Sequence, residues 1–144
     1  MKEYVVRRFF EGEYGPSDLE ADFPGTVTQT APDVRRVHFE PMTVPFEVQP
    51  AHIVKLIDAV LNGEIRLEVA QTISEWLDAN PHFNFSWDPD TPEGSRIADA
   101  VFWLGTPEIS YPLTSSVLSK IRHYVLTGEN LLTKADTKVR GAGA

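Results

Sequence analysis

The residues that could carry chemistry in this chain are acidic side chains and histidines. Two carboxylates in a cleft can act as acid and base, because burial shifts their pKa values. Here several carboxylates recur at spacings of three, four and seven, which places them together on the outer face of a predicted helix. Solvated carboxylates on such a face predict a charged contact surface rather than a catalytic pair. The set consists of Glu64, Glu68, Glu75 and Asp78.

The histidines give no sign of a metal site. They are His38, His52, His82 and His123, far apart in the sequence and in different predicted elements. No His-Glu-x-x-His and no His-x-His pair occurs, although zinc sites commonly use such short spacings. We interpret each histidine as a residue of the surface or of the core edge. Because the chain contains no cysteine, thiolate zinc sites, disulfides and cysteine nucleophiles are excluded.

Two aspartates before the third predicted helix resemble the start of a calcium-binding loop. Counted from Asp88, the sixth and twelfth positions hold Glu93 and Asp99. Calcium loops of this kind need a glycine and a glutamate at those positions. We therefore interpret Asp88 and Asp90 as turn formers and as negative charges for the start of the helix, and we expect no bound metal.

Sequence motifs of the common enzyme classes are absent. The chain has no Gly-x-Ser-x-Gly elbow, no Gly-x-Gly-x-x-Gly and no Gly-x-x-x-x-Gly-Lys loop. We therefore expect neither a cofactor nor enzymatic activity. An enzyme with a site of dispersed residues stays a third alternative, which requires at least two histidines and carboxylates to converge in a deep pocket.

A helical hairpin over residues 50–80 is the element around which the chain is organised. Apolar residues recur at spacings of three and four in both halves, as expected for two amphipathic helices. Pro50 suits a first helical turn, and Gly63 suits the left-handed end of the first helix. The apolar faces are formed by Ile53, Leu56, Ile57, Val60 and Leu61, and by Ile65, Val69, Ile73, Trp76 and Leu77.

The same hairpin could be read as a DNA-binding helix-turn-helix. A recognition helix meets phosphates and base edges through residues such as arginine and lysine. Here the second helix presents acidic residues outward, and Arg66 is its only cation. We therefore expect no nucleic-acid partner.

Two further helices follow the hairpin, at residues 93–104 and 114–126. The segment between, residues 81–92, is rich in proline and turn formers, and we expect no regular structure there. Its aromatic residues Phe83, Phe85 and Trp87 stand at alternate positions. Two interpretations stay open: the rings cap the core, or they form a contact surface for a partner, since aromatics are enriched at interfaces.

The N-terminal part, residues 1–49, lacks sustained helical periodicity. Its β-prone runs at 4–6, 9–10, 26–30, 34–39 and 42–48 predict a few short strands or an extended arm. Pro45 favours an edge position for the last of them. The expected fold is therefore a single α+β domain over residues 1–132, with a β part at 1–49, a helical part at 50–132 and a flexible tail at 133–144.

The net charge of −8 suits a basic protein partner, and the alternative interpretation, that the acidity only keeps the protein soluble, stays open. An acidic body repels nucleic-acid phosphates, whereas charge complementarity speeds association with a basic protein. No signal peptide and no stretch of roughly 20 apolar residues occurs. We therefore expect a cytoplasmic protein without a membrane partner.

The hairpin also carries a family resemblance. The run from Ile57 to Ile65, with Glu68, Ala70 and the Ser-Glu-Trp-Leu that ends at Leu77, resembles the helical pair of small acidic bacterial proteins. Most of these are uncharacterised, and some are described as immunity or antitoxin-like partners. The run Ala-Val-Phe-Trp-Leu-Gly ending at Gly105 is compatible with the same layout. The resemblance covers residues 50–126 and implies partner binding without a catalytic residue.

Two functional hypotheses follow. The first is an immunity-type protein-binding module that neutralises a basic toxin through an acidic, aromatic-containing surface. The second is a structural or assembly protein of a phage or secretion system that self-associates through its N-terminal β segments. A homodimer is the smallest assembly that this hypothesis allows. The contacts expected for the first hypothesis are Glu64, Glu68, Glu75, Asp78, Phe85, Trp87, Asp88 and Asp90.

Overall fold

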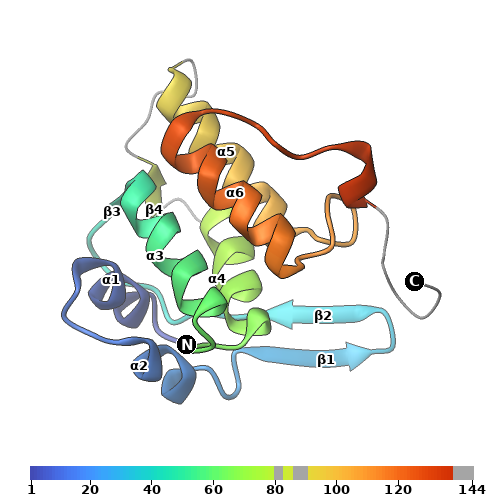
Figure 1. The fold of residues 1–144 in the computed structure, drawn as a ribbon. Helices are drawn as coiled ribbons and strands as arrows, with labels where there is room; N and C mark the ends of the chain where they lie inside the picture. The colour runs from blue at the N-terminus through green and yellow to red at the C-terminus, as the bar shows by residue number, and fades with distance from the viewer. Residues whose placement is uncertain (80–82, 86–90, 138–144) are drawn as a thin grey trace.

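The four helices from residue 50 onward pack on one another and carry much of the core (Figure 1). The protein is described here by a computed structural model, which covers residues 1–79, 83–85 and 91–137. Helices and short strands together form a single α+β domain, as the sequence predicts. The four helices are α3 (Pro50–Leu61), α4 (Leu67–Ala79), α5 (Pro92–Gly105) and α6 (Ser115–Thr127).

The predicted hairpin is confirmed as α3 and α4. Pro50 occupies the first turn of α3, and Gly63 has a positive φ of 71° in the turn between the helices. A left-handed conformation of this kind costs glycine little, because glycine has no Cβ. The apolar faces are directed inward: α3 packs against α6, and α4 packs against α5. Their fully buried side chains include Ile53, Leu56, Ile57, Val69, Ile73 and Leu77.

Helices α5 and α6 begin at threonine caps. The Thr91 hydroxyl accepts a hydrogen bond from the Gly94 N–H, and the Thr114 hydroxyl accepts one from the Val117 N–H, both at 3.1 Å. Such caps satisfy backbone donors that the first helical turn leaves unpaired. Both helices agree with the prediction to within a residue or so at each end.

The N-terminal segment differs from the prediction. Residues expected to be extended form two helices, α1 (Glu3–Glu11) and α2 (Pro16–Asp22). The reason lies in the spacing of Val5, Val6 and Phe9, which places these buried residues on one side of a helix. That amphipathic pattern outweighs the β propensity of the single residues.

Two small sheets complete the fold. In the first, β1 (Val27–Ala31) pairs antiparallel with β2 (Val34–Val37). In the second, β3 (Phe46–Val48) pairs parallel with β4 (Phe83–Phe85). The prediction of no regular structure in residues 81–92 is therefore wrong at β4. A strand forms there because the backbone of β3 pairs with it. The local sequence pattern does not predict this pairing with a distant segment.

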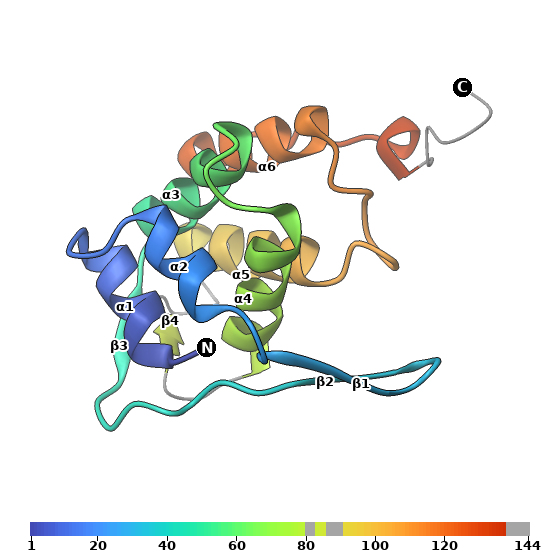
Figure 2. The same ribbon diagram turned by 90° about the horizontal axis from the view of Figure 1, so that it is seen from below.

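The β1–β2 hairpin projects from the helices, and we call it the arm (residues 27–37). Figures 1 and 2 show it extending past α4 on one side of the molecule. Every residue from 28 to 36 is exposed. The base of the arm packs on the core through the partly buried Val27 and Val37 and the buried Thr26 and Phe39 beside them.

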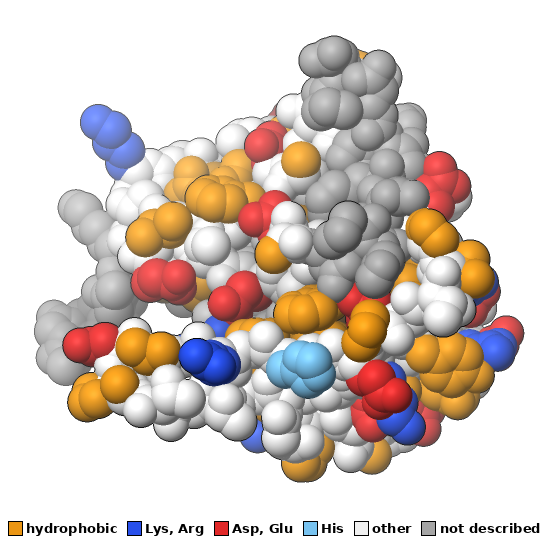
Figure 3. Space-filling view, turned by 180° about the vertical axis from the view of Figure 1, so that it is seen from behind, with side chains coloured by type: hydrophobic (Ala, Val, Ile, Leu, Met, Phe, Trp, Pro, Cys, Tyr) orange, Lys and Arg blue, Asp and Glu red, His pale blue; other side chains and the backbone are white. Residues whose placement is uncertain are grey.

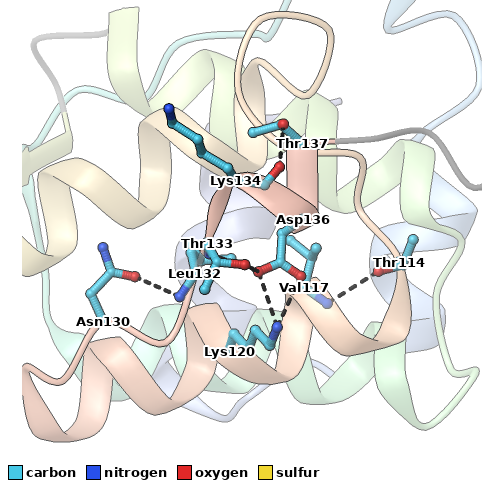
Figure 4. Close-up of polar contacts among 9 residues, drawn as sticks. All are labelled: Thr114, Val117, Lys120, Asn130, Leu132, Thr133, Lys134, Asp136 and Thr137. Carbon is cyan, nitrogen blue, oxygen red and sulfur yellow. Dashed lines mark hydrogen bonds and ion pairs between the residues drawn. The ribbon is translucent and has the colours of Figure 1, made fainter.

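The segment after α6 contacts that helix through an ion pair. It ends in a short 3-10 helix, η1 (Lys134–Thr137), and the Lys120 ammonium contacts both carboxylate oxygens of Asp136 at 2.9 and 3.0 Å (Figure 4). The Lys120 ion pair, together with hydrogen bonds from Thr133, lowers the pKa of the Asp136 carboxyl. The flexibility of the tail stays a prediction, and residues 138–144 lie outside the described part.

A buried carboxylate joins α1 to the rest of the molecule. Glu3 is fully buried. Its Oε1 accepts a hydrogen bond from the Met42 N–H at 2.9 Å, and its Oε2 accepts one from the Trp76 indole N–H at 2.7 Å. The Trp76 ring stacks on Phe39 with 4.9 Å between ring centroids. These contacts hold α1, the segment after β2 and α4 together.

Candidate protein-contact surface

The predicted acidic residues lie on α4 and on the turn before it. Glu64 is exposed in the α3–α4 turn, and Glu68 and Asp78 are exposed on α4. Glu75 lies on the same helix and is partly buried. The structure thus places one of the four in the turn before α4 and three on α4 itself, where residues three or four positions apart share a face.

An acidic cluster surrounds Arg66 at the α3–α4 turn; we define it as Glu20, Glu64, Arg66 and Glu68. Arg66 Nε lies 3.0 Å from a Glu20 oxygen, and its Nη1 lies 3.8 Å from a Glu68 oxygen. The Arg66 backbone N–H donates to Glu20 at 2.6 Å. One guanidinium is therefore shared by two carboxylates, and with Glu64 the cluster keeps an excess of negative charge.

Glu75 has a different environment from the other predicted contacts. The Arg35 guanidinium of the arm forms an ion pair with Glu75 and donates a hydrogen bond to the Thr72 hydroxyl at 2.7 Å. Sequence analysis could not find this pairing, because Arg35 and Glu75 are separated by 40 residues. The carboxylate of Glu75 consequently serves to fix the arm against α4.

The remaining predicted contacts are not placed by the structure. Phe85 belongs to β4, but its side chain lies outside the described part. Trp87, Asp88 and Asp90 also lie outside the described residues, and with them the segment considered as a calcium loop. The candidate surface is therefore built from the described residues of α2, α4 and the α3–α4 turn.

A groove lies beside the acidic cluster, between α1 and α3. Its volume is about 370 Å³, and apolar side chains form most of its lining. Lys55 crosses it and donates a hydrogen bond from its ammonium to the Phe9 carbonyl at 2.5 Å. Asp58 faces α6, where it accepts hydrogen bonds from Arg122 at 2.6 and 3.2 Å. The lining consists of Phe9, Pro16, Ala51, Val54, Lys55, Asp58, Ala59 and Glu64.

The described histidines lie in separate places. His38 follows β2, His52 is in the first turn of α3, and His123 is in α6. Among the described residues, no group of three or more histidine, aspartate and glutamate side chains has the geometry of a metal site. His82 lies outside the described part.

His52 has the most distinctive surroundings of the three. Its ring stacks on Phe10 at 5.1 Å and tilts against Phe46 at 5.2 Å between centroids. Its Nδ1 accepts a hydrogen bond from the Gln49 N–H at 2.9 Å, at the start of α3. Burial and the nearby Lys55 lower the pKa of His52. This residue therefore supports the helix start as a neutral ring.

The face of the molecule opposite to Figure 1 carries no single large apolar patch where atoms are described. In Figure 3, hydrophobic side chains are scattered there among polar and charged ones. Exposed apolar side chains of this scattered kind are normal for protein surfaces. The described atoms of this face therefore provide no second candidate surface.

Comparisons with known proteins identify no relative. No protein family, no curated protein and no solved structure matches this chain. The resemblance of residues 50–126 to immunity-type proteins stays a prediction. Among the described helices, none has the length and apolar character that a membrane span requires.

Proposed function

We propose that this protein is a non-catalytic protein-binding module of immunity type, which binds a basic partner through its acidic α4 side. The observation that carries the proposal is the acidic cluster, in which the single Arg66 is shared by Glu20 and Glu68 while Glu64 stays exposed. A surface with unbalanced charge of this kind attracts a partner of opposite sign and sets its orientation.

Asp78 extends the proposed contact surface along α4. Its carboxylate is exposed and has no hydrogen bond or ion pair with another described residue. The apolar groove next to Glu64 offers a place for an aliphatic or aromatic side chain of the partner, since hot-spot side chains often fill pockets from which water is excluded. We place this interaction in the cytoplasm.

The experiment is a pull-down from a lysate of the native host at low and high salt, read by mass spectrometry. We expect the wild type to retain one basic protein at low salt and to lose most of it at high salt, because salt screens exposed charges. The double variant Glu64→Gln, Glu68→Gln should retain at least about tenfold less of that protein.

The matched control carries the same change of charge on other elements. Glu47→Gln and Glu108→Gln remove two exposed carboxylates from β3 and from the segment after α5. This control variant should retain the partner as the wild type does. Equal retention by both double variants would contradict the acidic cluster as the contact surface, and recovery of no basic protein would contradict the proposed function.

A second candidate function is favoured by the arm. The alternative from the sequence, an assembly protein that self-associates through its N-terminal β segments, gains support from a hairpin whose residues 28–36 are all exposed. An isolated two-stranded hairpin is marginally stable, and further strands stabilise it. Analytical ultracentrifugation over a concentration series tests this candidate: a mass constant at 16.1 kDa would contradict it.

A further inference from the structure

The arm has two open edges, and they differ in chemistry. Among the described residues, its sheet consists of β1 and β2 alone, so each strand has one edge without a strand partner. β2 carries Arg35 and Arg36, whereas β1 carries no charged residue. Charged side chains are a common protection of edge strands against pairing with another chain. β1 lacks this protection.

The position of the strands makes β1 the accessible edge. β2 is the strand joined to α4, through the bonds from Arg35 to Thr72 and Glu75. β1 lies on the far side of β2 from α4 in Figure 1. The open edge of β1 therefore faces away from α4.

The backbone of β1 presents hydrogen-bonding groups to this open edge. In an antiparallel ladder, residues alternate between pairs bonded to each other and pairs whose N–H and C=O point outward. The His38 N–H donates to the Thr26 carbonyl at 2.9 Å, so Thr26 belongs to a bonded pair. With the register Val27–Val37, Thr28–Arg36 and Gln29–Arg35, the outward groups of β1 are those of Val27 and Gln29.

The sequence of β1 is close to symmetric about Thr28. Residues 26–30 read Thr-Val-Thr-Gln-Thr, so an antiparallel partner of the same sequence, centred on Thr28, meets only uncharged residues. A two-fold contact requires such self-complementarity, because the same patch serves both subunits. The outward groups of Val27 would then bond those of Gln29 in the second copy, and the two Thr28 side chains would lie side by side.

We infer that β1 pairs antiparallel with β1 of a second copy of this chain, about a two-fold axis at Thr28, to form a four-stranded sheet. This inference rests on the second candidate function and names its contact. The alternative pairing through β2 would bring the arginines of both copies together, and cross-strand like charges are destabilising. The antiparallel arrangement also places the two acidic bodies at opposite ends of the sheet, which limits their repulsion.

The contact is short. A register shift between Gln29 and Ala31 interrupts the ladder near the tip, so the regular part of β1 is confined to its first three residues. Interfaces of small area form weak or transient complexes. The dimer should therefore appear only as concentration rises, with the weight-average mass moving from 16.1 kDa toward twice that value.

The first test blocks the open edge with proline. Gln29→Pro removes an outward N–H and leaves the bonds between β1 and β2 in place, since proline is tolerated where the N–H faces solvent. The Gln29 side chain also bonds the Pro32 carbonyl at 2.7 Å, and Gln29→Ala controls for the loss of that bond. In analytical ultracentrifugation, the wild type and Gln29→Ala should dimerise, and Gln29→Pro should stay monomeric.

The second test uses the absence of cysteine from the chain. Thr28→Cys introduces the only thiol, and at a pair that is not hydrogen-bonded the Cα atoms lie about 4.5 Å apart, within reach of a disulfide. Mild oxidation should cross-link this variant far faster than Val34→Cys, which is an exposed position on β2. On a denaturing gel, dithiothreitol should return the cross-linked species to single chains.

The outcomes distinguish self-association as such from self-association through β1. A wild type that stays monomeric at all concentrations overturns both self-association and the β1 contact. A dimer that persists in Gln29→Pro, together with equal cross-linking of the Thr28→Cys and Val34→Cys variants, overturns the β1 contact alone and leaves self-association standing.

Discussion

Single residues decide how the parts of this molecule are joined, and Glu3 is the strongest example. Its carboxylate is fully buried and accepts hydrogen bonds from the Met42 backbone and the Trp76 indole. Removing an acceptor while its donors stay buried leaves them unsatisfied, which costs more than the net value of the bonds.

We predict that Glu3→Gln lowers the free energy of unfolding by about 1–3 kcal/mol, because the amide nitrogen of glutamine cannot accept a hydrogen bond. Urea unfolding followed by tryptophan fluorescence measures the change. Glu40→Gln, at an exposed carboxylate, is the control and should unfold close to the wild-type midpoint. An unchanged midpoint for the Glu3 variant would show that its carboxylate is not a structural acceptor.

His52 gives the molecule a dependence on pH. Its pKa in the folded state is lowered, first by burial and then by Lys55, against a smaller opposing effect of Glu11. The unfolded chain, in which histidine titrates near pH 6.5, then binds more protons than the folded chain over the interval below that value. The contribution of neutral His52 to the free energy of unfolding is therefore fully present above about pH 6.5, and it falls as the pH drops toward the folded-state pKa.

We predict that His52→Gln reduces this loss of stability below about pH 6.5, since glutamine can still accept the Gln49 N–H but does not titrate. Thermal unfolding at several pH values between 5 and 8 measures the slope. The exposed His38→Gln variant serves as comparison and should keep the wild-type slope. If the His52 and His38 variants show the same slope of stability against pH, the stacked His52 ring is not the source of the pH dependence.

At the scale of elements, α5 packs closely on α4 at Gly105. A Cβ added to Gly105, at the end of α5, would lie 2.9 Å from the Glu75 backbone nitrogen and 3.0 Å from its Cα. Backbone atoms inside a helix cannot move singly, so a side chain here would push the two helices apart. The same stretch of α4 receives Arg35, so this contact also sets the position of the arm.

We predict that Gly105→Ala destabilises the fold by about 1–3 kcal/mol through this overpacking. Gly15→Ala is the matched control, because no heavy atom lies within 4 Å of a Cβ at that position. Chemical denaturation measures both, and the control should change by less than about 1 kcal/mol. Equal effects would mean that loss of glycine, rather than the helix contact, is responsible.

On the scale of the whole molecule, the first 48 residues are not a separable arm. Helix α1 supplies the buried Val6, Phe9 and Phe10 to the core, and Glu3 joins it to α4. The projecting part is limited to the exposed residues 28–36, whose side-chain contact with the body is the Arg35 bond to α4. Exposed ion pairs contribute little to stability.

We predict that replacing residues 28–36 by a short Gly-Asn-Gly turn keeps the protein folded, with a loss of about 1 kcal/mol or less from the Arg35 pair. Deleting residues 1–48 should instead abolish cooperative unfolding, because it removes core residues. Circular dichroism melting curves distinguish the two. A cooperative transition in the longer deletion would show that the helical part folds alone.

The sequence by itself determined the helical half of this protein. Ile53, Leu56, Ile73 and Leu77 repeat at helical spacing, and Pro50 marks the start of the first helix, so α3 and α4 follow from local rules. The same rules located α5 and α6, and they placed Glu64, Glu68 and Asp78 on an outer surface.

Only the tertiary structure decided what joins distant segments. Phe9 and Phe10 could be read as strand residues until the core offered a surface for an amphipathic helix. The pairings of Glu3 with Trp76 and of Arg35 with Glu75 link residues 73 and 40 positions apart. A hydrogen bond between such residues depends on the packing of every element between them, and no local spacing encodes it.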